Sequence, residues 1–315
     1  MSNFDLVVLY EHPEWQKPLF RALERRGVRF GAFDLKRAAF DEGAKPEARV
    51  YFNQASPSAY VRNHTRAVPL ALSYMRNLEL KGATVLNGSK AFALELSKSA
   101  QGALLRRLGL RSPRTIVFND AEAVAPLASG FPFPALLKPE QGGSGARMFL
   151  LESFEELRRL LEMKPELWLP DNLLVLQEYI PTDPSTGIIR MEFLGGELLY
   201  AMRVVSHGRF NLCPSVACNP EEGTGACALP EPSAAPPVEF YPYPEVPAQA
   251  VEEGKRIMKE GGLDVGGIEY LPTEGGPVFY DINANSNLRE PIAAAFGFDP
   301  FERVVDFLVS KVRAA

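Results

Sequence analysis

A pair of glycines, Gly195-Gly196, interrupts the apolar segment IIRMEFLGGELLYAMRV in the second half of the chain. Two adjacent glycines between runs of strand-forming residues favour a β-hairpin, because the two-residue turn requires positive φ angles. Pairing Leu194 with Glu197 would bury one face of the hairpin and leave the other face charged. The apolar face would consist of Ile189, Met191, Phe193, Leu198, Tyr200 and Met202, and the opposite face of Arg190, Glu192 and Arg203. The chain is therefore predicted to contain an antiparallel sheet with one charged surface.

A second hairpin is predicted in GGIEYLPTEGGPVFYDINANSN, and it carries carboxylates. Asp281 and Asn283 are two residues apart on the last strand, so their side chains share a face. If the hairpin is centred near Gly275, Glu269 lies opposite Asp281 on that same face. Two carboxylates and an amide oxygen gathered at one place suit magnesium or manganese. We favour this metal site over a solvated polar face, because the rest of the strand is apolar.

The first part of the chain alternates predicted strands and helices. Apolar runs of the buried-strand kind lie at 6–10, 28–34, 49–53 and 84–86, with helical patterns at 18–26 and 70–80 between them. This rhythm predicts a parallel sheet and an α/β fold. We place the N-terminal lobe at residues 1–90, a middle lobe at 91–182 and a C-terminal lobe at 183–315.

The remaining elements are predicted from the same kinds of pattern. Amphipathic helices are expected at 89–108, 153–163, 248–260 and 300–312, and strands at 116–118, 135–138, 148–151 and 173–180. The segment 213–247 is rich in proline, glycine and small residues, and we expect a long surface excursion or lid there. Its cysteines, Cys213, Cys218 and Cys227, have no trusted zinc-ligand spacing and are interpreted as incidental thiols.

Two segments carry chemistry that suits a nucleotide. In LLKPEQGGSGARM a strand delivers Lys138 beside a loop containing Gly142, Gly143, Ser144 and Gly145, whose backbone N–H groups could approach phosphates closely. A plain hairpin with a glycine-rich turn explains this segment equally well. In LLVLQEYIP the strand ends at Gln177-Glu178, which suits the edge of adenine, with Asp183 a candidate for the ribose hydroxyls. Taken alone, that segment fits an ordinary strand end better.

Composition excludes several classes of protein. The net charge of -5 gives no global attraction to nucleic acid or to an anionic membrane. No apolar stretch approaches the roughly 20 residues that span a bilayer, and the N-terminus lacks the basic residues of a signal peptide. An odd number of cysteines fits a reducing cytoplasm. With three histidines in the chain, a hydrolytic triad is not favoured.

Taken in their order along the chain, these segments resemble the ATP-grasp carboxylate–amine ligases, and in particular the α-L-glutamate ligase type. The resemblance rests on VLNGSKAFALELSKSAQGALLRRLGLRSPRT, ALLKPEQGGSGARM, VLQEYIP, GIIRMEFLGGELLYAMRV, RFNL and GLDVGGIEYLPTEGGPVFYDINANSNL. It extends from about Leu70 to the end of the chain and is less distinct before that. It implies an ATP-grasp fold preceded by a parallel-sheet lobe, with ATP and magnesium (or manganese) as cofactors.

The resemblance also implies a role for each matching residue. Lys98 and Lys138 resemble the two nucleotide-binding lysines, although a lone helix lysine such as Lys98 is usually just solvated. Arg190 resembles the arginine that steadies the transferred phosphate. The remaining matches are the glycine loop with Gln141, the adenine side at Gln177, Glu178, Tyr179 and Ile180, the ribose contact Asp183, the cleft residues Arg203 and Asn211, and the metal ligands Glu269, Asp281 and Asn283.

Two departures from the family pattern concern the metal strand. The first two metal positions are Glu269 and Asp281, whereas the family often has aspartate and then glutamate. After this strand NSNLRE replaces the commoner ending with a small residue, proline and glycine, and this change affects the substrate side. The identity of the substrate is therefore left open by the resemblance.

The function implied is ATP-dependent formation of an amide or peptide bond through an acyl phosphate. The substrates would be a small amino acid, a peptide or a protein, and a homo-oligomer is expected by analogy. Three alternatives remain: a ligase that modifies a peptide or protein by glutamate addition or side-chain cross-linking, an ATP-grasp kinase, and a non-catalytic nucleotide-binding module. The presence of Arg190 and of all three metal positions argues against the last.

Overall fold

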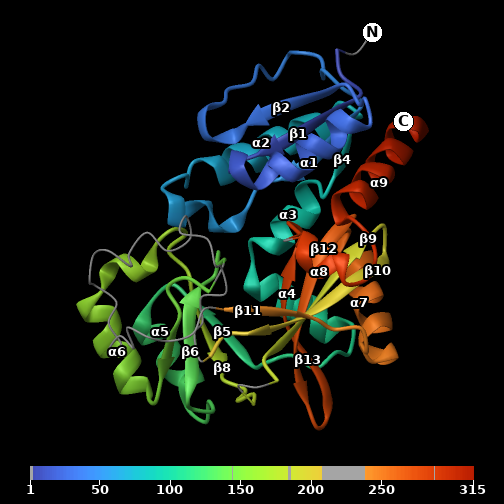
Figure 1. Cartoon of the computed structure of the whole chain (residues 1–315). Helices are drawn as coiled ribbons and strands as arrows, with labels where there is room; N and C mark the ends of the chain where they lie inside the picture. The colour runs from blue at the N-terminus through green and yellow to red at the C-terminus, as the bar shows by residue number, and fades with distance from the viewer. Residues whose placement is uncertain (1–2, 144, 184–185, 208–237, 287) are drawn as a thin grey trace.

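The computed structural model describes residues 3–143, 145–183, 186–207, 238–286 and 288–315, which form three β-sheets with helices packed around them (Figure 1). The sheets contain strands from within 6–86, 115–178 and 188–283, and we call them the first, second and third sheets in that order. Where the chain divides into lobes stays a prediction. Among the described residues, none of the helices has the length and apolar character needed to cross a membrane.

The first sheet is parallel throughout, as predicted, and has the order β2-β1-β3-β4. Its strands are β1 (Leu6–Tyr10), β2 (Phe30–Asp34), β3 (Val50–Gln54) and β4 (Thr84–Leu86). Successive side chains of β1 point to opposite faces. Val7 and Leu9 pack towards α2 (Ala67–Leu80), while Leu6 and Val8 pack towards α1 (Pro13–Arg25) and the C-terminal α9 (Pro300–Ala314). Burial on both faces explains why these strands are continuously apolar.

The second sheet is antiparallel and has the order β5-β8-β6-β7. Its strands are β5 (Thr115–Phe118), β6 (Ala135–Pro139), β7 (Phe149–Leu151) and β8 (Leu174–Glu178), and α5 (Ala121–Ala128) and α6 (Phe154–Met163) share its apolar core. The strand β8 does not form an edge of this sheet. This strand lies between β5 and β6, and the backbone N–H of Glu178 donates to the carbonyl of Arg114 at 2.9 Å.

The third sheet contains both predicted hairpins and has the order β11-β10-β9-β12-β13. Its strands are β9 (Ile188–Leu194), β10 (Glu197–Val205), β11 (Glu239–Pro242), β12 (Val265–Thr273) and β13 (Gly276–Asn283). The pairings of Leu194 with Glu197 and of Glu269 with Asp281 are confirmed. One face packs against α4 (Lys98–Arg107) and α7 (Ala248–Gly261). The strand β11 was not predicted, because it lies within the proline-rich segment 213–247.

A β-bulge in β10 overturns the expectation that Arg203 shares a face with Arg190. The register shifts between Leu198 and Tyr200, so Met202 lies opposite Arg190, and Arg203 lies opposite Ile189. One extra residue moves every later side chain to the other face of the sheet. Arg203 therefore lies on the face away from Arg190, where its guanidinium is 5.0 Å from the ring centroid of Tyr241.

The long helix expected at 89–108 is two helices, α3 (Ser89–Glu95) and α4 (Lys98–Arg107). Ser97 is the N-cap of the second helix, because its hydroxyl accepts the backbone N–H of Ala100 at 3.1 Å. The buried carboxylate of Glu140 accepts the Ser97 hydroxyl at 2.7 Å and the backbone N–H of Ser99 at 3.1 Å. Lys98 is thus the first residue of a helix whose start is fixed by the second sheet, and not a residue within a long helix.

Other boundaries differ less from the predictions. The helix expected at 18–26 begins at Pro13, since proline fits the first turn of a helix, and Pro18 is tolerated within it. The short helix α8 (Glu290–Ala294) and the 3₁₀ turns η1 (Leu35–Arg37), η2 (Pro57–Arg62) and η3 (Pro165–Trp168) were not predicted. The cysteines of the 213–247 segment lie outside the described residues.

Asn87 ties the first sheet to the third. Its fully buried amide donates to the carbonyl of Val265 at 2.7 Å and accepts the N–H groups of Asp264 at 2.8 Å and Val265 at 3.1 Å. A buried amide with all these partners fixes the spacing of the elements that it joins. The loop between β4 and α3 is thereby held against β12, which carries Glu269.

Candidate active site

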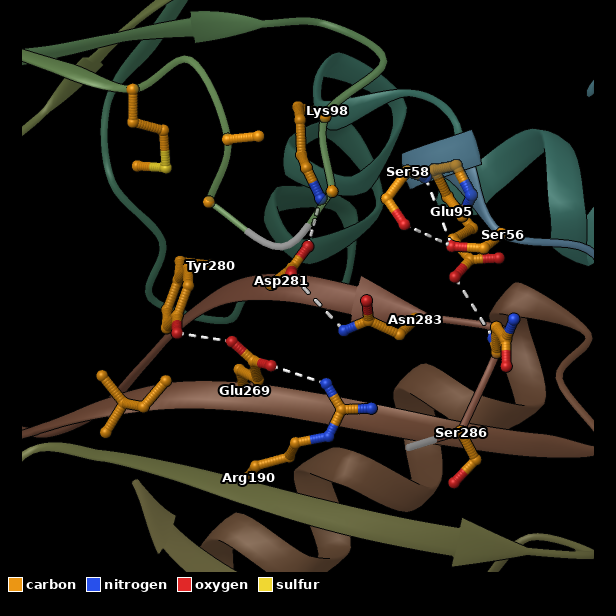
Figure 2. A pocket seen from close by; sticks show the side chains of 18 of the residues that line it. Ser56, Ser58, Glu95, Lys98, Arg190, Glu269, Tyr280, Asp281, Asn283 and Ser286 are labelled. Carbon is orange, nitrogen blue, oxygen red and sulfur yellow. Dashed lines mark hydrogen bonds and ion pairs between the residues drawn. The ribbon is translucent and has the colours of Figure 1, made fainter. Parts of the chain in front are cut away.

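A cavity of about 720 Å³ lies where the three sheets meet, and it is lined by residues from each of them. The first sheet contributes Gln54 and the following turn contributes Ser56 and Ser58, while the second contributes Lys138 and Gln177. The residues Lys98, Arg190, Glu269, Asp281 and Asn283 also line it, and Figure 2 shows all five around one central space. Of the residues singled out in the sequence, the structure therefore brings the two lysines, Arg190 and the metal candidates into one pocket.

Arg190 is buried between two carboxylates. Its Nε donates to Glu192 at 2.6 Å. Its Nη1 donates to Glu269 at 2.7 Å (Figure 2). Burial alone would lower the pKa of Arg190, but the two carboxylates raise it, so the guanidinium stays charged. A Cβ at position 267 would come within 2.2 Å of Nη2 of Arg190, so the neighbouring strand must have glycine there. The local sequence thus makes room for one fixed cation.

Glu269 and Asp281 face each other across β12 and β13, but they have different surroundings. Burial raises the pKa of Glu269 despite the nearby Arg190, and the hydroxyl of Tyr280 donates to its other oxygen at 2.5 Å. For Asp281, burial would raise the pKa, but the ion pair with Lys98 outweighs it and lowers the pKa. Asp281 is therefore held ionised by a cation from α4.

Asn283 completes this group on β13. Its Nδ2 donates to the carbonyl of Gly267 at 3.2 Å. It also donates to Asp281 at 3.4 Å (Figure 2). This orientation leaves its Oδ1 as the atom able to meet a cation. Among the described residues, no three histidine, cysteine, aspartate or glutamate side chains meet as a metal-binding group. The set of two carboxylates and one amide oxygen still fits magnesium, which keeps several ligands from water and substrate phosphates.

Lys138 is the cation of the second sheet. Its side chain is buried, and its Nζ donates to Oε1 of Gln177 at 2.8 Å, while Nε2 of Gln177 donates to Thr115 at 3.2 Å. Burial, and then the nearby charge of Lys98, lower the pKa of Lys138 to about 8. The hydrogen bond that the structure gives this ammonium goes to a neutral amide, so an anionic phosphate in the cavity would stabilise its charge.

The glycine loop bends over the cavity beside the first sheet. Gly142, Gly143 and Gly145 line the cavity, and Ser144 lies outside the described residues. A Cβ on Gly143 would approach the Cβ of Ser58 to 2.7 Å, so the loop contacts the η2 turn at a point that only glycine allows. The backbone N–H of Gln141 donates to Asp171 at 2.9 Å and fixes the start of the loop.

Of the residues predicted to contact adenine and ribose, some line the cavity and one does not. Gln177, Glu178, Tyr179 and Ile180 line the cavity. The carboxylate of Glu178 accepts the backbone N–H of Arg114 at 2.9 Å, so it holds β5 against β8. Asp183 is exposed and is not among the residues that line the cavity. Its predicted contact with ribose stays a prediction.

Two predicted cleft residues do not join the group. The bulge in β10 turns Arg203 to the other face of the third sheet, and it does not line the cavity. Asn211 lies outside the described residues. In their place the structure adds Glu95, Ser56, Ser58 and Tyr280, which sequence reasoning missed. Glu95 gives a weak sequence signal as a charged residue in the apolar run AFALEL.

The chain resembles known proteins in sequence. No protein-family model matches it. A probable alpha-L-glutamate ligase of Teredinibacter turnerae is 29% identical over 243 residues, which cover 76% of this chain and 72% of the relative. A probable alpha-L-glutamate ligase of Haemophilus influenzae is 23% identical over 266 residues, which cover 83% of this chain and 78% of the relative.

Solved structures resemble the chain over nearly its whole length. The RimK domain protein ATP-grasp from Sphaerobacter thermophilus has a TM-score of 0.69 at 17% identity and covers 96% of this chain and 98% of its own. D-alanine–D-alanine ligase from Bacillus anthracis has a TM-score of 0.66 at 13% identity and covers 98% of this chain and 97% of its own. The ATP-grasp ligase PsnB complexed with minimal precursor, Mg and ADP has a TM-score of 0.64 at 19% identity, with 99% of each chain covered. These likenesses establish the ATP-grasp fold.

Proposed function

We propose that the chain is an ATP-grasp C–N ligase akin to the α-L-glutamate ligases, which joins a carboxylate to an amine through an acyl phosphate and releases ADP and phosphate. The observation that supports this most is the convergence of Lys138, Arg190 and the Glu269–Asp281 pair on one cavity. Such a site can hold a triphosphate and a substrate carboxylate together, and phosphoryl transfer to a carboxylate oxygen requires this.

The nucleotide would lie along the second sheet. Its phosphates would meet Lys138 and the N–H groups of the glycine loop, and its base would lie near the Gln177 to Ile180 segment. Lys138 is buried with a lowered pKa, and a phosphate beside it would restore its full charge. The contact of Gly143 with Ser58 would let the loop cover the phosphates and exclude water.

Phosphoryl transfer would occur over the third sheet. A substrate carboxylate oxygen attacks the γ-phosphorus, and the bond from that phosphorus to the leaving oxygen of ADP breaks. Arg190, held in place by Glu192 and Glu269, neutralises the charge that spreads over the phosphoryl oxygens. Glu269, Asp281 and Asn283 would hold a magnesium or manganese ion, which when bound supplies further positive charge at the phosphates.

The second half of the reaction forms the amide. The amine nitrogen attacks the carbonyl carbon of the acyl phosphate, and the carbon–oxygen bond to the phosphate breaks. Because an acyl phosphate is readily hydrolysed, the cavity must keep water away from it until the amine arrives. The enclosure of the site by three sheets and the glycine loop suits this requirement.

The experiment that tests this proposal is an ATP turnover screen with magnesium that measures ADP and AMP separately. The panel consists of amino acids and short peptides, with L-glutamate first because the relatives' names contain it. The proposal predicts ADP release and an amide product when a carboxylate and an amine are both present. AMP as the product would contradict the acyl-phosphate route, and a stable phosphorylated product from one acceptor would identify a kinase.

The same screen shows whether the substrate is a free amino acid or a peptide. A solved structure of similar fold is described as an ATP-grasp ligase complexed with a precursor peptide. Turnover with peptides and none with free amino acids would place this chain among ligases that modify a peptide or protein. Turnover with free amino acids would place it among ligases of small metabolites.

A further inference from the structure

Glu95 is a buried carboxylate that the proposed reaction has not yet used. It is the last residue of α3, it lines the cavity, and 3% of its surface is exposed. Its Oε1 accepts the backbone N–H of Asn285 at 3.2 Å. Its Oε2 is buried and has no hydrogen-bond partner among the described residues. A buried polar atom left without a partner is rare, because it loses its hydration without compensation.

The surroundings of Glu95 differ from those of the proposed metal ligands. Figure 2 shows its carboxylate on the side of Asp281 where Ser56 and Ser58 lie. The hydroxyls of these two serines are 2.8 Å apart and follow the carboxyl end of β3 in the first sheet. Glu95 therefore faces the first lobe, while Lys138 and the nucleotide-edge residues belong to the second sheet.

The position of Glu95 suits contact with the amine substrate, which attacks after the phosphoryl group has been transferred. The nucleotide side of the cavity is the second sheet, and the phosphoryl group would be transferred over Arg190 and Asp281. The carbonyl carbon of the acyl phosphate would then lie on the far side of the phosphate from ADP, towards the first lobe. A nucleophile that approaches this carbon must come from the side where Glu95, Ser56 and Ser58 lie.

We propose that the carboxylate of Glu95 binds the ammonium group of the amine substrate and removes the proton that must leave before the nitrogen can attack. This inference rests on the proposed ligase reaction and deepens it. The ammonium gives one proton to Oε2 of Glu95 and becomes a neutral amine, whose lone pair forms the new carbon–nitrogen bond. The phosphate leaves with the bonding electrons and takes the second proton from nitrogen, and Glu95 returns its own proton to solvent.

The electrostatics of the site agree with this role. Burial raises the pKa of Glu95 to about 8, although the N–H of Asn285 and the charge of Lys98 act in the opposite direction. The other charged groups that act on it are Asp281 of β13, which raises the pKa, and Arg190 of β9, which lowers it. A base is most effective when its pKa is near the working pH and near that of the α-amino group, which is about 8.

The test compares two nucleophiles in the Glu95→Gln variant. Hydroxylamine is largely unprotonated at neutral pH, so it traps an acyl phosphate as a hydroxamate without needing a base. With ATP, magnesium and a carboxylate substrate, the variant should form hydroxamate at close to the wild-type rate. Amide formation with L-glutamate, or with the panel amine that the wild type uses, should fall by about 10²-fold or more.

The matched control is Glu79→Gln. Glu79 accepts the N–H of Ser89 at 2.7 Å at the other end of α3, and it does not line the cavity. Glu79 belongs to α2, so this variant changes the same chemical group at a contact with the same helix α3, and it should keep the wild-type ratio of amide to hydroxamate. Thermal unfolding of both variants checks that neither change disrupts the fold.

Each other outcome has a distinct meaning. If the wild type forms no hydroxamate with any carboxylate, the acyl-phosphate proposal itself fails. If the wild type forms hydroxamate, and Glu95→Gln either loses both products equally or keeps both, the assignment of Glu95 is overturned. It is also overturned if the wild type forms hydroxamate but no amide with any amine of the panel.

Discussion

The second and third sheets enclose the cavity from two sides, and they carry their charges in different ways. On the third sheet, Arg190 is held by Glu192 and Glu269, and Asp281 is held by Lys98. On the second sheet, the buried Lys138 contacts the neutral Gln177. The third sheet therefore has its cations and anions already paired, while the second presents a cation whose charge is costly to keep buried.

This difference shows how the site can be rigid and still depend on its substrate. The paired groups of the third sheet are fixed before ATP arrives, which favours a preorganised place for phosphoryl transfer. In the described part of the second sheet, no carboxylate forms an ion pair with Lys138, although the charge of Glu140 acts on it, so this sheet gains most from the phosphates. We therefore expect changes in the third sheet to affect chemistry and folding, and changes in the second sheet to affect nucleotide binding.

The largest effect is expected from Asp281→Asn. The change removes a carboxylate from the proposed metal group and leaves Lys98 without its anion. We expect ADP formation with both substrates to fall by about 10³-fold, since the charge at the transferred phosphate is the main catalytic contribution. The control Glu239→Gln alters a partly exposed carboxylate on the same sheet, outside the cavity, and should be near wild type. Equal rates for both variants would contradict the role given to the third sheet.

The next effect is on folding and separates the two arginines of the first hairpin. Arg190→Met would leave Glu192 and Glu269 buried without their cation, and we expect the free energy of unfolding to fall by about 3–5 kcal/mol. Arg203→Met removes a cation over Tyr241 on the other face and should cost about 1 kcal/mol. Urea denaturation of both variants measures the difference. Similar losses would mean that the bulge in β10 does not separate these residues as described.

A moderate effect is expected on the pH dependence of ATP binding. Lys138 has a pKa of about 8 in the free protein, so it loses its proton above that pH, whereas bound phosphates would keep it charged. Binding then takes up a proton, and the affinity should fall by up to about tenfold per pH unit above pH 8. Calorimetric titration with ATP in buffers of pH 7 to 9.5 measures this fall.

The variant Lys138→Met serves as the control for that titration. It should bind ATP more weakly at neutral pH and should lose the decline above pH 8. The same shift also affects folding: a lysine with a lowered pKa in the folded state destabilises the fold below pH 8, and stability rises as pH rises from about 8 towards 10.5. An unchanged slope in the variant would assign the decline to another group.

The smallest effect is expected at the start of α4. Ser97→Ala removes the hydroxyl that accepts the N–H of Ala100 and donates to Glu140. We expect the free energy of unfolding to fall by about 1 kcal/mol, the usual contribution of such a cap. Ser310→Ala near the end of α9 removes an exposed hydroxyl and should cost less. Equal costs would indicate that the contact with Glu140 does not fix Lys98.

The hairpins could be predicted from the sequence because glycine pairs mark their turns. The predicted pairing of Glu269 with Asp281 was confirmed, but it depends on a β-bulge between Glu269 and Tyr270 that shifts the register set by the turn. The bulge after Leu198 could not be predicted, because nothing in the alternation of ELLYAMRV shows where an extra residue is inserted. For the same reason the prediction that Arg190 and Arg203 share a face of the hairpin was wrong.

The break between α3 and α4 was missed because the helical pattern continues across Leu96 and Ser97. The cap depends on Glu140, which lies 43 residues further along the chain. Glu95 was missed for a related reason, since a single carboxylate in an apolar helix shows its importance only when its unpartnered oxygen is seen to line a cavity. The alternation of side chains along one strand predicts which of its residues share a face. Contacts between residues far apart in the sequence can be seen only in the three-dimensional structure.

The most direct test of the proposed chemistry is the transfer of oxygen-18 from a labelled carboxylate substrate. The acyl-phosphate route predicts that the released inorganic phosphate contains one labelled oxygen from the carboxylate, because the carbon–oxygen bond breaks when the amine attacks. Mass spectrometry of the phosphate measures this. Label found in AMP would show adenylation, and phosphate without label would show that the carboxylate was never phosphorylated, so either result would contradict the account.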